Sequence, residues 1–99
     1  MSYNHMAELL SWKAAQRFGL KNKGDIAQGY DADIVLVDPH ESFVVHASES
    51  ESKQGYSPFE GVELSGRVKS TFLRGALIYD NGNVVGPATG QYLRRPIIK

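Results

Sequence analysis

The stretch GDIAQGYDADIVLVD, residues 24–38, decides how the rest of the chain is organised. It predicts a strand, a tight turn and a second strand, which is the apolar run IVLV at residues 34–37. An apolar run without polar alternation is typical of a strand that is covered on both faces. Gly29 offers a backbone position open to positive φ, while Asp31 and Asp33 can accept hydrogen bonds from turn amides. We therefore expect these three residues to have structural roles.

Upstream of this stretch the sequence predicts one helix. Its apolar residues recur at steps of three and four, which is typical of a single buried helix face: Met6, Leu9, Leu10, Ala14 and Phe18. Ser2 or Asn4 can cap the first turn, and Gly19 is suited to end the helix. Cations gather at that end, where the helix dipole favours them: Arg17, Lys21 and Lys23.

Downstream, the sequence predicts short strands joined by turns. Asp38-Pro39 is expected to end the pairing of the first long strand, because proline cannot donate to a ladder. Residues 42–46 then resume as a short strand. A meander follows, with strands at residues 67–73, 76–79 and 84–85. Its two turns are marked by residues suited to positive φ: Arg74-Gly75 and Asn81-Gly82.

Within the strand at residues 67–73, Val68 and Phe72 are expected to share one face, with Thr71 on the other. Two further segments lack the pattern of helix or strand. Residues 47–57, ASESESKQGYS, contain no large aliphatic side chain and are expected to form an exposed, mobile loop. Residues 87–99 form a basic and aliphatic tail that we expect to cross another element or a neighbouring subunit.

Composition limits the classes of function. The 99 residues include eleven basic and eleven acidic side chains, so no general attraction for nucleic acid or an anionic membrane is expected. The absence of cysteine excludes a disulfide framework and a thiolate metal site. No signal peptide or membrane-spanning segment is recognisable, so we expect a cytoplasmic protein. A chain this short forms one domain at most and cannot hold a large enzyme core.

The sequence contains no recognisable catalytic or metal-binding motif. Three histidines stand apart, without HxH or HExxH spacing: His5, His40 and His46. A calcium loop that starts at Asp31 fails, because Leu36 and Ser42 stand where such a loop needs glycine and glutamate. There is also no GxSxG elbow and no glycine-rich phosphate loop. We therefore assign no catalytic, cofactor-binding or metal-binding residue in this chain.

The stretch KGDIAQGYDADIVLVD, residues 23–38, resembles the signature that follows the barrel in cyclic amidohydrolases, the family of allantoinases, dihydroorotases and hydantoinases. Four more pieces are similar to that family in the same order: AAQRFGL at residues 14–20, YSPFEG at 56–61, TFLRGALIYDNG at 71–82 and GQYLRR at 90–95. Two positions depart from the pattern. Lys13-Ala14 stands where the family usually has Asn-Pro, and residues 53–55, KQG, stand where allantoinases often have a His-Lys pair.

This resemblance implies a mainly β fold with one N-terminal α-helix. Residues 1–20 would be a polar start and the last helix of a TIM barrel, and residues 21–99 would be the C-terminal half of the β-sandwich that flanks the barrel. The implied parent enzyme is a hydrolase that opens a cyclic amide, allantoin to allantoate in purine catabolism. Dihydroorotase and hydantoinase or dihydropyrimidinase are the alternatives. The binuclear divalent metal of such enzymes, zinc, would be held by barrel residues that precede the matched part, so this chain alone would be inactive.

A free-standing β-module that acts by protein association is the alternative from a different class. Half a sandwich would leave an apolar face and a strand edge uncovered, and residues 34–37 are the segment most prone to pair. The expected partners are the barrel and the N-terminal strands of the parent enzyme. For the isolated chain we expect a homo-oligomer formed by edge pairing or by exchange of the helix.

Overall fold

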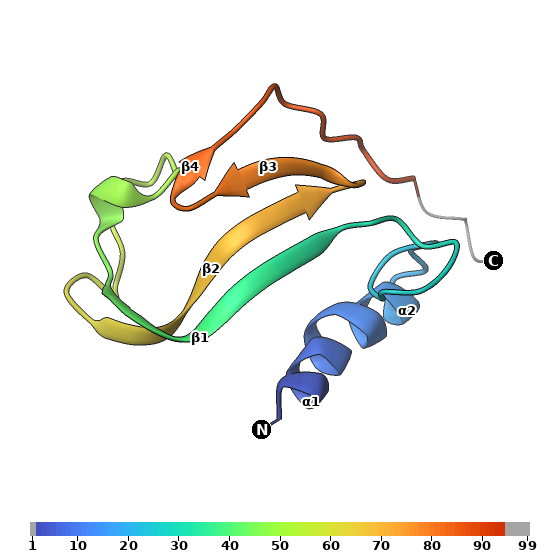
Figure 1. The fold of residues 1–99 in the computed structure, drawn as a ribbon, viewed down its shortest axis with the longest axis horizontal. Coiled ribbons are helices and arrows are strands. Elements are labelled where there is room, and N and C mark those ends of the chain that lie inside the picture. Colours follow the sequence, from blue (N-terminus) through green and yellow to red (C-terminus); the bar gives the residue numbers. More distant parts are fainter. Residues whose placement is uncertain (1, 95–99) are drawn as a thin grey trace.

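The computed structural model describes residues 2–94 of the 99 (Figure 1). A helical segment is followed by a four-stranded antiparallel sheet with strand order β1-β2-β3-β4. The helical elements are α1 (Tyr3–Ala7), η1 (Glu8–Trp12) and α2 (Lys13–Arg17), with a short 3-10 turn η2 (Ala47–Glu49) later in the chain. The strands are β1 (Ile34–Val44), β2 (Glu63–Leu73), β3 (Ala76–Asp80) and β4 (Asn83–Val84). The predicted fold class, mainly β with one N-terminal helix, is confirmed.

The elements α1, η1 and α2 form one continuous helix with a wider π turn at its centre. Ser2 caps it as predicted, because its Oγ accepts a hydrogen bond from the backbone N–H of His5 at 3.1 Å. The helix closes at Gly19, which has φ 69°, and the N–H of Leu20 donates to the carbonyl of Ala15 at 2.9 Å.

The predicted buried face of the helix is wrong. Ala15 is the helical residue that is buried, with 3% of its surface exposed, whereas Leu10 on the predicted face is 72% exposed. The reason is that no described strand residue lies within 8 Å of the helix between Cα atoms. The loop at Gly24 takes that place instead. A Cβ at Gly24 would lie 2.8 Å from the Cβ of Ala15 and 2.7 Å from the carbonyl oxygen of Ser11.

Residues 24–33 form an irregular loop of bends and one turn, and the first strand predicted there is absent from the structure. Gly24 and Gly29 have φ values of 89° and 85°, which take the backbone out of the extended conformation. The backbone groups of this loop bond locally, with the N–H of Tyr30 donating to the carbonyl of Ala27 at 3.1 Å. The sheet therefore begins at β1, at Ile34.

The β1–β2 ladder is interrupted at Pro39 but does not end there. Asp38 pairs with Arg67, the register then shifts, and pairing resumes between Ser42 and Ser65. The predicted break in pairing is thus present as an irregularity inside one strand that continues to Val44. Proline removes a donor from the ladder, and an irregularity accommodates that loss.

A second irregularity lies at Lys69 on β2. Leu36 pairs with Ser70 and Val37 with Val68, so Lys69 is an extra residue opposite β1. Such a bulge reverses the alternation of side chains along the strand. Val68 therefore lies on the same face as Thr71, and the prediction that separated them is wrong.

Six residues on this face stand opposite one another across the four strands. We call them the valine face: Val35, Val37, Val68, Thr71, Tyr79 and Val84. The opposite face holds a polar pair at its centre, where the hydroxyl of Ser70 donates to Asp80 Oδ1 at 2.9 Å.

Tight turns join the last three strands. Arg74 and Gly75 have φ values of 47° and 83°, and Asn81 and Gly82 have φ values of 47° and 93°. Two consecutive positive φ values are typical of the primed turns that match the twist of paired strands. The last strand is Asn83–Val84, one residue earlier than predicted.

Both faces of the sheet are open to solvent. Val35, Leu36 and Val37 are 52%, 50% and 51% exposed, although neighbouring residues of a strand point to opposite faces. The chain exposes 8309 Å² in total. A compact folded chain of this mass exposes about 5,600 Å². The expectation that residues 34–37 are covered on both faces is therefore wrong for this chain by itself.

The connection from β1 to β2 contains η2 and is largely exposed, as expected for the loop at residues 47–57. Glu60 fixes its beginning, because Oε1 accepts from the N–H of Ala47 at 3.2 Å and Oε2 lies 3.1 Å from His46 Nδ1. Residues 87–94 contain no strand, and the rest of the predicted tail lies outside the described residues. The predicted division at residue 20 stays a prediction.

Candidate functional site

The most connected polar cluster among the described residues joins the loop before β1 to the turn between β2 and β3. Lys23 Nζ lies 2.5 Å from Asp33 Oδ2 and 2.9 Å from Asp31 Oδ2. The other oxygen of Asp33, Oδ1, accepts a hydrogen bond from the backbone N–H of Arg74 at 2.9 Å. Beside it the N–H of Gly75 donates to the carbonyl of Ala32, also at 2.9 Å. We call the four residues Lys23, Asp31, Asp33 and Arg74 the clamp.

The clamp is shielded from solvent on the lysine side. Only 13% of the Lys23 side chain is exposed, compared with 32% of the Asp33 side chain. Hydrogen bonds to Asp33 and then to Asp31 raise the pKa of the Lys23 ammonium. The hydrogen bond from Lys23 lowers the pKa of the Asp33 carboxyl, and the amide of Arg74 acts in the same direction. Both groups are therefore held in their charged forms.

These opposite shifts predict a stability plateau with two limits. Asp33 contributes stability above its unfolded pKa of about 3.9, and the contribution is lost as the pH falls through its lower folded value. Lys23 contributes stability below its unfolded pKa of about 10.4, and the contribution is lost as the pH rises through its higher folded value. Urea midpoints measured across this range should fall at both ends. In Asp33→Asn the urea midpoint should fall less steeply at acidic pH than in the unsubstituted chain. An equally steep fall would contradict the stabilising role of the Asp33 carboxylate.

Lys23 is a residue whose partner the sequence prediction missed. We grouped it with the cations at the end of the helix, but its ammonium binds the two aspartates of the loop. A usable signal was present, because Lys23 opens the same motif that contains Asp31 and Asp33. The guanidinium of Arg74 extends the cluster by donating to the carbonyl oxygen of Thr89, so the chain after β4 is also connected to the clamp.

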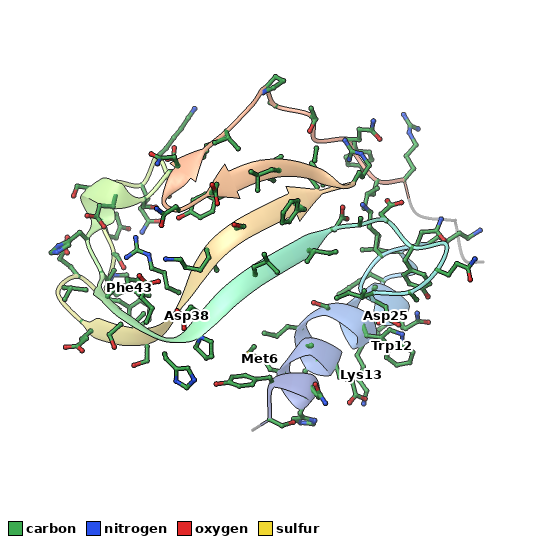
Figure 2. All side chains as sticks on the ribbon, in the orientation of Figure 1. Met6, Trp12, Lys13, Asp25, Asp38 and Phe43 are labelled. Carbon is green, nitrogen blue, oxygen red and sulfur yellow. The ribbon has the colours of Figure 1, made fainter. Side chains whose placement is uncertain are left out.

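The helix meets this loop through Trp12 as well. Trp12 lines a shallow hollow together with Gly24 and Asp25, and Figure 2 places its side chain beside Asp25 at the junction of helix and loop. Trp12 and the loop thus border the same hollow. The helix is attached to the rest of the molecule through the loop of residues 18–33.

The described residues do not fit a metal centre. No group of three or more histidine, cysteine, aspartate or glutamate residues among them is arranged to hold a metal ion. His5 lies in α1 and His40 in β1, while His46 faces Glu60 at the start of the long connection. The carboxylates of the clamp are occupied by Lys23 and by a backbone amide. The metal implied by the resemblance finds no ligand set in residues 2–94.

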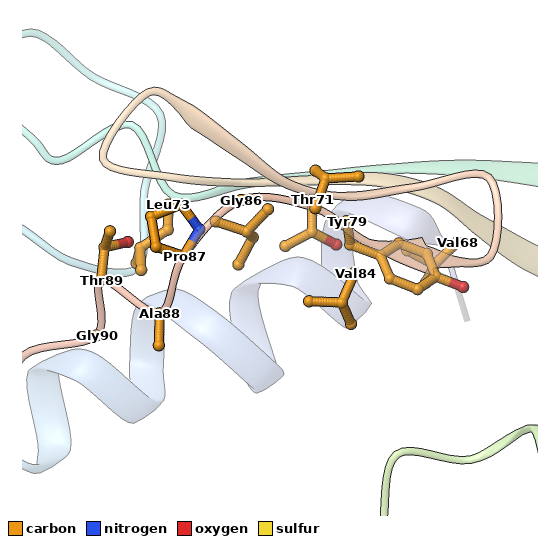
Figure 3. A pocket seen from close by; sticks show the side chains of 12 residues that line it. Val68, Thr71, Leu73, Tyr79, Val84, Gly86, Pro87, Ala88, Thr89 and Gly90 are labelled. Carbon is orange, nitrogen blue, oxygen red and sulfur yellow. The ribbon is translucent and has the colours of Figure 1, made fainter.

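An apolar groove of about 560 Å³ lies beside β3 (Figure 3). Side chains of the valine face form its floor, and the segment after β4 forms one wall. Its lining contains no charged residue: Val68, Thr71, Leu73, Ile78, Tyr79, Val84, Val85, Gly86, Pro87, Ala88, Thr89 and Gly90. Its hydroxyl-bearing residues, Thr71, Tyr79 and Thr89, have no histidine or charged residue beside them in this lining that could activate them.

Comparison with known proteins decides the family. Residues 1–85 match the Amidohydrolase family. The chain belongs to the amidohydrolase family. Among its relatives, an allantoinase from Rubrobacter xylanophilus is 40% identical over 90% of this chain, and a D-hydantoinase from Rhizobium radiobacter is 39% identical over 96% of it. The chain covers 20% and 21% of these two relatives.

Solved amidohydrolase structures share the same arrangement of helix and sheet. A D-hydantoinase from Bacillus sp. AR9 superimposes with a TM-score of 0.80 at 40% identity, over 96% of this chain and 21% of that one. An L-hydantoinase (dihydropyrimidinase) from Arthrobacter aurescens gives a TM-score of 0.82 at 32% identity, over 87% of this chain and 19% of that one. This amidohydrolase chain thus spans about a fifth of the length of its relatives. None of its described helices has the length and apolar character needed to span a membrane.

Proposed function

We propose that this chain is the non-catalytic C-terminal part of a cytoplasmic, metal-dependent cyclic-amide hydrolase, an allantoinase that converts allantoin to allantoate. In this role it acts as a scaffold beside the catalytic barrel. The clamp is the observation that supports the proposal. The charged residues of the most family-like stretch bind one another and a turn amide, so they position the loop after the helix on the sheet.

The open faces of the sheet support the same role. A domain whose sheet exposes the valine face and its opposite face is suited to receive further strands, as the resemblance implies for the parent enzyme. The exposed apolar residues of the helix, Leu9 and Leu10, would then pack on the barrel. Catalytic ligands would come from the barrel of the parent enzyme.

The choice of allantoin as the ring substrate rests on sequence identity to the bacterial allantoinases. A hydantoinase or dihydropyrimidinase is the second candidate, favoured by the superposition on solved hydantoinases. Joining the chain to its own upstream coding sequence and assaying allantoin, dihydroorotate, hydantoin and dihydrouracil would separate these parents. Allantoin is the expected substrate, and preference for another ring would replace the substrate while leaving the scaffold role intact.

A pair of chimaeras tests the scaffold role directly. The matching fifth of the Rubrobacter xylanophilus allantoinase is replaced by this chain, and the same exchange is made in the Rhizobium radiobacter D-hydantoinase. Each chimaera should keep the ring preference of its own host, because a scaffold does not contact the reacting atoms. A ring preference that followed this chain into both hosts would contradict the proposal. So would hydrolysis of allantoin by the 99-residue chain alone with added zinc, cobalt or manganese.

A further inference from the structure

We propose that Arg74 is a latch for the segment that follows β4. This segment, residues 86–94, which we call the strap, lies beside β3 because the guanidinium of Arg74 holds it there. When this contact is lost, the strap moves away from the sheet and the groove beside β3 loses one wall. The inference concerns the conformation of this chain and is independent of the proposed scaffold role.

Arg74 lies where segments from distant parts of the chain meet. Its backbone N–H donates to Asp33, which is 41 positions earlier, and its guanidinium donates to the carbonyl oxygen of Thr89, which is 15 positions later. Figure 1 shows the chain after β4 running back beside β3 toward the turn between β2 and β3. Arg74 therefore connects both the loop before β1 and the strap to this one turn.

The strap has few other attachments. The N–H of Val85 donates to the carbonyl of Ile78 at 2.9 Å, which within residues 2–94 is the last backbone hydrogen bond between the chain and β3. Beyond Val85, the bond from Arg74 to Thr89 is the hydrogen bond that ties residues 86–94 to the rest of the described chain. Tyr92, near the end of the strap, is 88% exposed. The position of the strap therefore depends on Arg74.

Apolar packing does not replace this contact. The groove between the strap and the sheet has a volume of about 560 Å³ and is not filled by side chains (Figure 3). Atoms that face an open space do not gain the dispersion energy of closely packed atoms. The strap residues that line the groove are all small: Gly86, Pro87, Ala88, Thr89 and Gly90. They bury little apolar surface against the sheet, so a polar contact determines where the strap lies.

The turn itself does not require an arginine. Arg74 has a φ of 47°, a conformation that most L-residues adopt at a cost and that asparagine and glycine tolerate best. The turn between β3 and β4 has the same φ of 47° at its first position, and it carries Asn81 there. The arginine is therefore explained by the contact of its side chain and not by the shape of the turn.

Arg74→Asn separates the latch from the turn. Asparagine suits this backbone conformation and keeps the N–H that donates to Asp33, whereas the guanidinium is lost. Backbone amide NMR relaxation of the 99-residue chain gives order parameters for residues 88–90 of the strap. In the unsubstituted chain these should be close to the value of a rigid backbone, about 0.85, and in Arg74→Asn they should fall below about 0.6.

Hydrogen exchange at Val85 detects a slower movement of the strap. The amide of Val85 is bonded to Ile78 directly before the strap begins. Arg74→Asn should lower its protection roughly tenfold or more, because the released strap leaves this end of the ladder free to open. The amide of Gly75, which donates to Ala32, should keep its protection because the turn and its bond to the loop remain.

Arg17→Asn is the matched control. It removes the same side chain from an exposed position at the end of the helix. It should leave both the order parameters of the strap and the protection of Val85 unchanged. Equal changes in the two variants, or no change in Arg74→Asn, would overturn the proposal. Order parameters below about 0.6 in the unsubstituted chain would also overturn it, because the strap would then not be held.

Arg74→Gly covers the case in which the asparagine variant does not fold. Glycine adopts positive φ without strain and also lacks the guanidinium. A mobile strap beside an ordered sheet in Arg74→Gly is the expected result. A strap that stays ordered in this variant would contradict the role of Arg74 as a latch.

Discussion

Replacement of Gly24 by alanine should destabilise the chain by roughly 2–5 kcal/mol, the sum of an unfavourable backbone conformation and overpacking. The φ of Gly24 is 89°, a conformation that L-residues adopt at a cost. The added methyl would also lie 2.7 Å from the carbonyl oxygen of Ser11 and 2.8 Å from the Cβ of Ala15. Neither neighbour can rotate away, because one is backbone and the other is the most buried residue of the helix.

Gly29→Ala is the control for this substitution. Gly29 has nearly the same φ, 85°, in the same loop, but an added Cβ would meet no atom within 4 Å. Gly29→Ala should therefore lower the free energy of unfolding only by the cost of the backbone conformation, about 1–2 kcal/mol. Urea unfolding of both variants at one fixed protein concentration gives the difference directly. Equal midpoints for the two variants would show that the approach of the loop to the helix contributes nothing to stability.

Asp33→Ala is the second substitution with a large expected effect, a loss of about 1–3 kcal/mol. Alanine removes two hydrogen bonds at once, the one from Lys23 Nζ and the one from the backbone N–H of Arg74. It also leaves the Lys23 ammonium, which is mostly shielded from solvent, with Asp31 as its remaining partner. About a third of the Asp33 side chain is exposed, so water can replace part of what is lost.

Two controls separate the charge of Asp33 from its geometry. Asp33→Asn keeps an oxygen that can accept from Arg74, so it should lose less stability than Asp33→Ala. Asp25→Ala makes the same chemical change at a site where, within residues 2–94, the carboxylate accepts from the neighbouring amide of Ile26. It should shift the midpoint by a few tenths of a kcal/mol at most. A loss in Asp25→Ala equal to that in Asp33→Ala would mean that the loop responds to any lost carboxylate, and that the clamp is not special.

The features that the sequence predicted well are those determined by neighbouring residues. The Ser2 cap and the hairpin at Asn81-Gly82 depend on side-chain and backbone preferences within a few positions. The resemblance of residues 23–38 to the amidohydrolase signature led to the correct family for a similar reason, because such a signature is local in sequence.

The features that the sequence missed depend on distant partners. The sequence around Lys69 does not show that Lys69 is the extra residue of a β-bulge, because the bulge is defined only by the register of β2 against β1. The buried face of the helix was predicted wrongly because periodicity gives an apolar stripe but not the element that covers it. The link from Asp33 to Arg74 joins residues 41 positions apart, and no short motif contains both.

That separation of 41 residues also leads us to expect an order in which the molecule assembles. The β2–β3 hairpin closes across two residues and can form early, whereas the amide of Arg74 reaches Asp33 only after β1 has paired with β2. The loop after the helix is attached to the turn between β2 and β3 by hydrogen bonds, from the N–H of Arg74 to Asp33 and from the N–H of Gly75 to the carbonyl of Ala32. We therefore expect the helix and its loop to dock after the sheet has formed, and their opening to precede the opening of the sheet. Hydrogen exchange at the amide of Arg74 reports that opening while β2 and β3 remain paired.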